Sequence, residues 1–320
     1  MTRWLLRRAL QSVLTLAIAL LLLFLIVHAL PGDPLAREGD RVLSPEQVEQ
    51  LRRRYGLDRP LPGQLAAFAT GLARGDLGTS IEYDRPVVTL LRERLPATLL
   101  LGGTALLLIF TLGIWLGVRQ AVRKDSREDR WLTTVSLAGY ATPSFWLGLV
   151  LANLIGVRWH LLPPAGMRNP LGEAGLWPTT IDVLRHLVLP ASTLAIVTLA
   201  GTMRYQRSAM LEVLRLPYIV TARAKGLAER RVIWRHAWRN ALFPVLTLFG
   251  LWLPFLVSGS VFVEAVFAWP GLGSLAVAAV GNRDYPVLMG TSILVAGMVV
   301  MGSLLSDLAY AILDPRVRRA

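Results

Sequence analysis

Residues 98–118 read TLLLGGTALLLIFTLGIWLGV, an apolar run without a single charged side chain. A helix rises about 1.5 Å per residue, so a run of this length covers a hydrocarbon core about 30 Å thick. Five further runs of similar character occur at residues 9–30, 132–157, 187–203, 241–263 and 287–313. Only the last contains a formal charge, Asp307. The sequence therefore predicts an all-α, polytopic membrane protein with six transmembrane helices.

The composition agrees with a membrane protein and excludes several classes of enzyme. Of the 320 residues, 54% are hydrophobic and 17% are charged, against roughly 45–50% and about 25% in soluble domains. The chain has no cysteine, which excludes disulfides, thiolate metal sites and cysteine nucleophiles. Its four histidines are scattered, and no glycine-rich phosphate-binding motif occurs. We therefore expect no catalytic residue, no metal site and no cofactor bound by this chain.

Basic residues are distributed unequally among the segments that connect these runs. The two ends and the connections at 119–131 and 204–240 hold 20 lysines and arginines against 6 acidic residues. The alternate connections, 31–97, 158–186 and 264–286, hold 14 of each sign. Basic connections face the cytoplasm, so both termini are predicted to be cytoplasmic. The net charge of +13 then reports orientation in a bilayer and does not indicate a nucleic-acid partner.

The first run and the connection after it form an N-terminal part, residues 1–95. The run is longer than the roughly 7–15 apolar residues of a signal peptide, so we interpret it as a membrane span. Ser44-Pro45 followed by Gln47 predicts a helix start, and Gly56 predicts its end. A second short helix is predicted over 60–73. This extracytoplasmic helical segment is followed by a core with five spans, residues 96–313, and a cytoplasmic tail, residues 314–320.

The other two outer connections are rich in proline and tryptophan. Pro163-Pro164 and Trp177-Pro178 favour extended or turn structure in the second connection. In the third, the apolar turn that contains Trp269, Pro270 and Gly271 could dip back toward the membrane. Either turn could shape an outer gate or anchor the chain at the bilayer interface.

The inner connection 204–240 combines small residues with a strongly basic stretch. Ala222 and Gly226 are four residues apart and would share one face of a helix, which would let another backbone approach closely. Basic side chains around this pair can donate hydrogen bonds to carboxylates; they are Arg223, Lys225, Arg230 and Arg231. The segment fits either a plug for a groove on a cytoplasmic partner or a solvated basic loop held near anionic lipid.

Two further features lie inside the predicted spans. Gly113 and Gly117 form a GxxxG pair, which is typical of close helix packing in membranes. Asp307 is a carboxylate within a span, which is a functional candidate by default. Since Asp307 lies only seven residues before Asp314, a position near the inner interface and a structural pairing with an arginine are the preferred interpretation.

Many short motifs along the chain resemble those of one family of membrane proteins. The inner connection carries TARAKG at 221–226, followed by His236, Arg239-Asn240 and Pro244. The other motifs are PGDP at 31–34, YGLDRPLP at 55–62, GDLGTS at 75–80, RPV at 85–87, LPAT at 95–98, TPSFW at 142–146, LLP at 161–163, FAWPGLG at 267–273, RDYP at 283–286 and LDPR at 313–316. Together they resemble the permease subunits of bacterial ABC importers, specifically the dipeptide/oligopeptide/nickel family.

One motif departs from the broader importer pattern. In that pattern the coupling loop has Glu-Ala-Ala, three further residues and Gly. Here Val220 and Thr221 occupy the first two positions, so only Ala222 and Gly226 match. The departure argues against one essential carboxylate and shifts the expected contact to the small and basic residues.

The resemblance implies a type I ABC importer permease fold in the bacterial cytoplasmic (inner) membrane and import of di- or oligopeptides. It also implies a second homologous permease subunit, two cytoplasmic ABC ATPase subunits that bind ATP and Mg, and an extracytoplasmic substrate-binding protein. The implied ATPase-coupling residues are Thr221, Ala222, Arg223, Ala224, Lys225, Gly226, Arg230 and Arg231. A nickel importer subunit shares these motifs and stays an alternative. A self-contained secondary transporter or channel is the alternative from another class.

Overall fold

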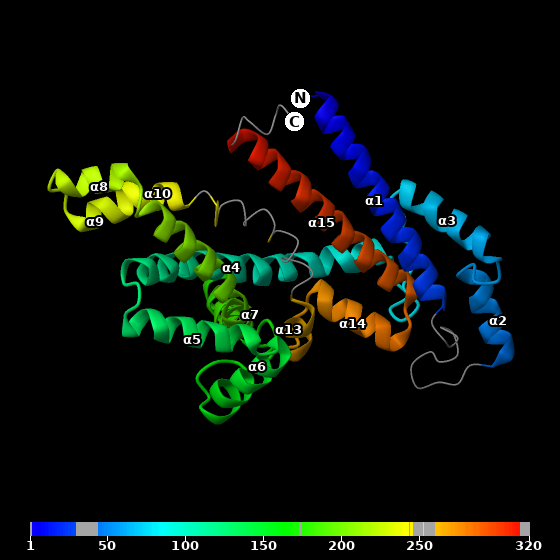
Figure 1. The fold of residues 1–320 in the computed structure, drawn as a ribbon. Helices are drawn as coiled ribbons and strands as arrows, with labels where there is room; N and C mark the ends of the chain where they lie inside the picture. The colour runs from blue at the N-terminus through cyan, green and yellow to red at the C-terminus, as the bar shows by residue number, and fades with distance from the viewer. Residues whose placement is uncertain are drawn as a thin grey trace. The chain divides into compact units, whose positions relative to one another are not determined.

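The computed structural model describes residues 2–29, 44–172, 175–242, 244–245, 252 and 260–313, and within these ranges its regular elements are helices (Figure 1). Four helices are long and apolar enough to cross a membrane, and a bent pair makes a fifth candidate. Most of the predicted span 241–263 lies outside the described residues, as does the tail 314–320. The expected helical, multi-pass architecture is therefore found, with four or five of the six predicted spans described.

The chain folds into two compact units. The first comprises Met1–Thr98 and Pro270–Val300, and the second comprises Leu99–Trp269 and Met301–Ala320. The helices of the first unit are α1 (Thr2–Ala29), α2 (Pro45–Arg54), α3 (Leu61–Ala73), the start of α4 (Val87–Val122), α14 (Leu272–Asn282) and most of α15 (Tyr285–Leu313). The two short helices predicted after the first span are thus present as α2 and α3.

A buried carboxylate organises the first unit beside its apolar core. Asp284 is 1% exposed and accepts hydrogen bonds from Ser80 Oγ at 2.5 Å and from the backbone N–H groups of Ile81 and Glu82. It also accepts from the Val287 N–H at 3.3 Å, as an N-cap of α15 does. The start of α15 is thereby joined to the loop that precedes α4.

The second unit is built around one long helix, α7 (Leu176–Val213), which contacts α5, α6, α10 and α13. The other elements are the rest of α4, α5 (Arg127–Ala141), α6 (Ser144–Leu151), a π-helical segment η1 (Ala152–Arg158), α8 (Pro217–Ala224), α9 (Glu229–Arg231), a second π-helical segment η2 (Val232–Ala237), α10 (Trp238–Ala241) and α13 (Val261–Val266). Because many α7 side chains are buried, this helix positions the segments that follow it.

The third predicted span is not one straight helix, which corrects the expectation for 132–157. Helix α5 ends at Ala141, and the axis of α6 and η1 is bent by 103° from that of α5. Proline disfavours the α conformation of the residue before it. Accordingly Thr142, which precedes Pro143, has φ −85° and ψ 127°. The break could not be predicted from the apolar run, because hydropathy carries no information about the backbone conformation of the residue before a proline.

Trp177 and Pro178 are helical, whereas the sequence suggested extended or turn structure. They lie in the first turn of α7, which begins at Leu176. A proline is tolerated there because the first backbone N–H groups of a helix have no partner within the helix. The long α7 therefore starts eleven residues before the apolar run at 187–203.

A buried ion pair fastens α5 to α7. Arg207 donates to Asp129 through two nitrogens, at 3.1 and 2.8 Å, and the Asp129 side chain is 5% exposed. The neighbouring Glu128 instead pairs with Arg119 and Arg123, whose side chains are 41% and 57% exposed.

Asp129→Asn is expected to destabilise the protein by about 3 kcal/mol, because it leaves the Arg207 guanidinium without its counter-charge in a largely buried position. Glu128→Gln is the matched control and should cost less than about 1 kcal/mol, since its partners are exposed. Thermal unfolding of the detergent-solubilised protein measures both. Equal losses of stability would contradict the structural role of the Asp129 pair.

Candidate functional site

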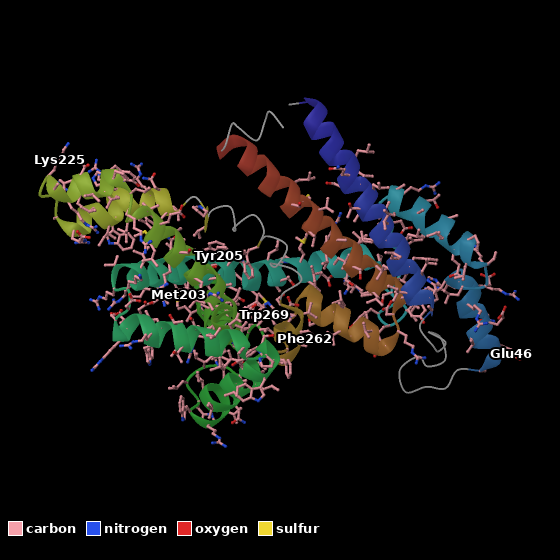
Figure 2. The ribbon with its side chains drawn as sticks, viewed as in Figure 1. Glu46, Met203, Tyr205, Lys225, Phe262 and Trp269 are labelled. Carbon is pink, nitrogen blue, oxygen red and sulfur yellow. The ribbon has the colours of Figure 1, made fainter. Side chains whose placement is uncertain are left out.

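The inner connection forms a helical hairpin that extends from the end of α7 (Figure 1). Pro217 is the first residue of α8, where its fixed φ suits a helix start. The chain reverses between Ala224 and Glu229, and Gly226 adopts φ +76°, a conformation that favours glycine. Lys225 lies at the tip of the hairpin (Figure 2). We call residues 217–241 the coupling hairpin.

The coupling hairpin has an apolar core of its own. Ile219 and Ala222 of α8 share this core with Val232, Ile233 and Ala237 of η2. The same core includes residues from the neighbouring ends of α4 and α7, namely Val118, Ala121, Ala209 and Met210. The hairpin is therefore anchored to two of the long helices, so a force on it would be transmitted to them.

The small face expected for Ala222 and Gly226 is not formed. Ala222 is 7% exposed and belongs to the internal core, whereas Gly226 lies beyond the end of α8 and is exposed. The physical reason is that α8 buries its apolar side against η2, and Ala222 lies on that side. Thr221, Arg223, Ala224 and Lys225 are exposed, so these neighbours of Ala222 can contact a partner.

Polar contacts across the hairpin hold its two arms together. Arg223 donates to both carboxylate oxygens of Glu229, at 3.1 and 2.7 Å. The hydrogen bond from Arg223 holds the pKa of Glu229 below its usual value, so this carboxylate is charged at neutral pH. On the other side, Asn240 Nδ2 donates to the hydroxyl oxygen of Tyr218 at 2.6 Å.

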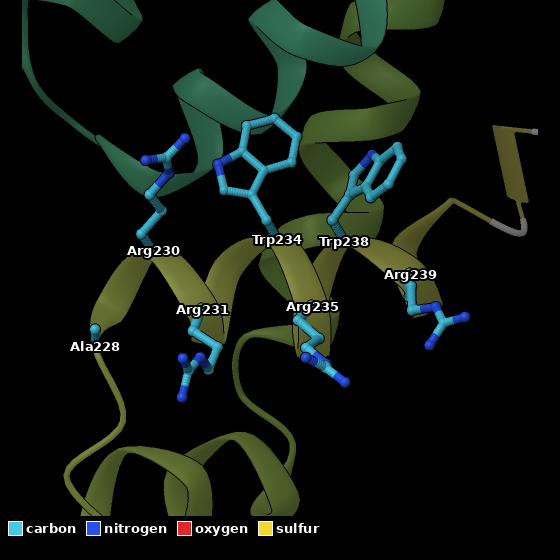
Figure 3. Close-up of a pocket in the computed structure, with 7 residues that line it drawn as sticks. All are labelled: Ala228, Arg230, Arg231, Trp234, Arg235, Trp238 and Arg239. Atoms are coloured by element: carbon cyan, nitrogen blue, oxygen red, sulfur yellow. The ribbon is translucent and has the colours of Figure 1, made fainter.

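Two rows of large side chains follow the returning arm of the hairpin. Arg231, Arg235 and Arg239 recur every four residues and point to one side, while Arg230, Trp234 and Trp238 point to the other (Figure 3). These six residues and Ala228 line an open hollow of about 770 Å³. All four arginines are exposed, and within the part of the chain that the structure describes none of them makes an ion pair.

This surface is suited to binding an acidic partner rather than to chemistry. The hairpin contains six basic residues and one acidic residue, Glu229, which Arg223 neutralises. Arginine side chains bind carboxylates through paired hydrogen bonds, and the two tryptophans add apolar contact area. From the sequence, Arg230 and Arg231 were expected to contact a partner, Arg239 was noted only as part of a family motif, and Trp234, Arg235 and Trp238 were not singled out. The spacing of four residues in 230/234/238 and 231/235/239 is the signal that could have found them.

The glycine pair in α4 lies against α7. A β-carbon added at Gly113 would lie 2.9 Å from the Thr202 side chain. One added at Gly117 would lie 2.6 Å from the carbonyl oxygen of Met203 and 2.8 Å from Gln206 Cβ. Real β-carbons do not approach other atoms this closely, so α4 and α7 pack at a distance that only glycine permits at these two positions.

The candidate outer-gate residues lie in a tight turn after α13. The Trp269 side chain is fully buried, and the backbone N–H of this residue donates to the Glu264 carbonyl oxygen at 2.8 Å. The preceding residue, Ala268, has φ +47°. Pro270 and Gly271 follow, and Gly271 is the N-cap residue of α14. The side chain of Asp307, the charged candidate within the last span, lies outside the described residues.

Two family descriptions match this chain. Residues 109–319 match the binding-protein-dependent transport system inner membrane component, and residues 1–102 match the N-terminal part of such membrane components. The oligopeptide transport system permease AppB of Bacillus subtilis is 42% identical over 318 residues, covering 99% of both chains. The dipeptide permease DppB of Escherichia coli K12 is 40% identical over 336 residues with the same coverage. A di/tripeptide permease DppB of Pseudomonas aeruginosa is 40% identical over 93% of both chains.

Proposed function

The chain belongs to the family of binding-protein-dependent transport system inner membrane components, and on that premise we propose that it is the permease subunit of an ATP-driven peptide importer. The observation that carries the proposal is the full-length similarity to permeases named for oligopeptide, dipeptide and di/tripeptide transport. These names favour a peptide substrate over nickel. The chain acts as a non-catalytic membrane subunit within such an importer.

We propose a topology of six spans in the bacterial cytoplasmic membrane, with both termini in the cytoplasm. The charge distribution supports this orientation, because basic connections stay on the cytoplasmic side. In this topology residues 1–95 provide the first span and an extracytoplasmic helical segment, residues 96–313 form the transport core, and residues 314–320 form a cytoplasmic tail. The coupling hairpin then faces the cytoplasm.

The coupling hairpin is the proposed docking site for one of two cytoplasmic ATPase subunits. The exposed residues of α8 and the turn, together with the arginine rows of the returning arm, offer hydrogen-bond donors to an acidic groove. ATP and Mg bind to the ATPase subunits, and closure of the ATPase pair moves the hairpin. Because the hairpin shares its core with α4 and α7, that movement reaches the membrane spans directly.

The same proposal assigns roles to the outer turn and the glycine pair. The turn at Trp269, Pro270 and Gly271 contributes to the outer gate. Two observations support this role: the Trp269 side chain is buried, and Ala268 has a strained backbone conformation. Gly113 and Gly117 keep α4 and α7 in close contact, so the two helices move together. A second homologous permease subunit completes the pathway, and an extracytoplasmic binding protein delivers the peptide.

Reconstitution of the complete importer in liposomes tests the proposed function. We expect a labelled dipeptide or oligopeptide to accumulate only when the binding protein, both permeases and ATPase subunits with ATP are all present. Uptake by this chain alone, driven by an ion gradient, would support a secondary transporter instead. Accumulation of nickel without peptide uptake would support the nickel alternative.

A further inference from the structure

A hollow of about 840 Å³, lined by both polar and apolar side chains, lies between α5 and α7, close to the end of α7 that leads into the coupling hairpin. This volume falls within the range of about 300–1,000 Å³ found for small-molecule sites. The residues that line it include Thr133, Ser136 and Tyr140 of α5 and Arg204, Tyr205 and Ser208 of α7. Figure 2 shows where Met203 and Tyr205 lie on α7.

Each helix turns a polar stripe toward the hollow. On α5 the stripe is Thr133, Ser136 and Tyr140; on α7 it is Tyr205 and Ser208. Spacings of three and four residues place the members of each stripe on one helix face. Thr133 and Ser136 donate their hydroxyl hydrogens to carbonyl oxygens of their own helix, so these oxygen atoms can still accept hydrogen bonds from an occupant. The two stripes therefore suit water or a polar occupant.

The charges around the hollow are unbalanced. Arg207 is neutralised by its two hydrogen bonds to Asp129. Arg204 is exposed, and within the described ranges it has no ion-pair partner. Among the residues that the structure describes, none of the side chains that line the hollow is acidic. Its net charge is therefore one positive charge, located about 13 Å along the helix from the end of α7 at Val213.

We propose that this hollow is the segment of the peptide pathway that this subunit supplies, and that Arg204 attracts the peptide carboxylate. This inference rests on the proposed function, and it specifies which residues of this chain contact the peptide. Hydroxyl groups of the two stripes bond to peptide N–H and C=O groups, while Arg204 pairs with the C-terminal carboxylate or an acidic side chain. An electropositive, hydroxyl-lined path suits short peptides of varied sequence, because it binds the backbone and the carboxylate that all of them carry.

The absence of cysteine makes the hollow directly testable. Ser136→Cys and Ser208→Cys change one atom each, and Leu107→Cys on the exposed apolar part of α4 is the control. Inside-out vesicles carrying the assembled importer are treated with membrane-impermeant methanethiosulfonate reagents, one anionic and one cationic, and modification is measured by the mass of this chain. We expect both hollow positions to react at least about tenfold faster than Leu107→Cys, because water reaches them.

The charge of Arg204 is tested in the same vesicles. Adding Arg204→Gln to Ser208→Cys is expected to slow the anionic reagent about three- to tenfold relative to the cationic one. Arg215→Gln, a change in an exposed arginine just past the end of α7, should leave the ratio unchanged. Added dipeptide should protect Ser208→Cys more weakly once Arg204 is replaced.

The outcomes separate this inference from the proposed function. If the importer transports peptide but Ser136 and Ser208 positions resist both reagents, the second permease or lipid covers the hollow and the inference is wrong. An unchanged reagent ratio after Arg204→Gln would likewise refute the role of Arg204. If the complete importer takes up no peptide although the hollow positions react, the proposed function fails and the hollow is only a hydrated space.

Discussion

Replacing Gly117 with valine is expected to eliminate the native packing of α4 on α7. The β-carbon alone would lie 2.6 Å from the Met203 carbonyl oxygen and 2.8 Å from Gln206 Cβ. A backbone atom cannot rotate away as a side chain can, so the two helices must separate. Overpacking of this kind costs about 3 kcal/mol or more, a large part of the roughly 5–15 kcal/mol that stabilises a folded domain.

Size-exclusion profiles and thermal unfolding of the detergent-solubilised permease measure this effect. Gly117→Ala should already lower the unfolding temperature, and Gly117→Val should leave little monodisperse protein. Gly103→Ala is the matched control in the same helix, because a β-carbon there meets no atom within 4 Å. A valine variant that elutes and unfolds like the parent would contradict the close α4–α7 contact.

The double variant Arg231→Glu/Arg235→Glu is expected to lose association with the ATPase subunits. Both arginines lie on one exposed row of the coupling hairpin (Figure 3). Reversing them changes the local charge by four units and places carboxylates opposite the acidic groove that we propose. A loss of about 3 kcal/mol in binding, roughly a hundredfold, is the expected scale for such pairs.

Co-purification of the ATPase subunits with tagged permease measures this loss. The control variant Arg127→Glu/Arg130→Glu makes the same charge change at exposed positions near the start of α5. It should retain association, because these arginines lie outside the hairpin. Since the substituted side chains are all exposed, both variants should fold. Equal retention of the ATPases by the two variants would refute the docking assignment.

Much of the fold could be predicted because its determinants are local. A charge-free run such as 98–118 has few options other than a membrane helix. The start of α2 at Pro45 and the reversal at Gly56 depend on residues within one or two turns. The bend at Thr142-Pro143 was missed, although its cause is also local, because hydropathy outweighed the proline in the interpretation.

The position of the coupling hairpin in the sequence could be predicted from its motif, but which of its residues are buried and which are exposed could not. Spacing alone placed Ala222 and Gly226 on a shared outer face, whereas Ala222 is buried against η2 and Gly226 ends the helix. Which side of α8 turns inward depends on residues ten or more positions later.

Composition, apolar runs and basic segments were sufficient to predict a multi-pass helical membrane protein, because each depends on the transfer of a short segment from water to lipid. The roles of individual charged residues depended on the tertiary packing. Arg204 and Arg207 are three residues apart on one helix and look equivalent in the sequence. Only the approach of α5, which brings Asp129 to Arg207, neutralises one arginine and leaves the other at the hollow between α5 and α7.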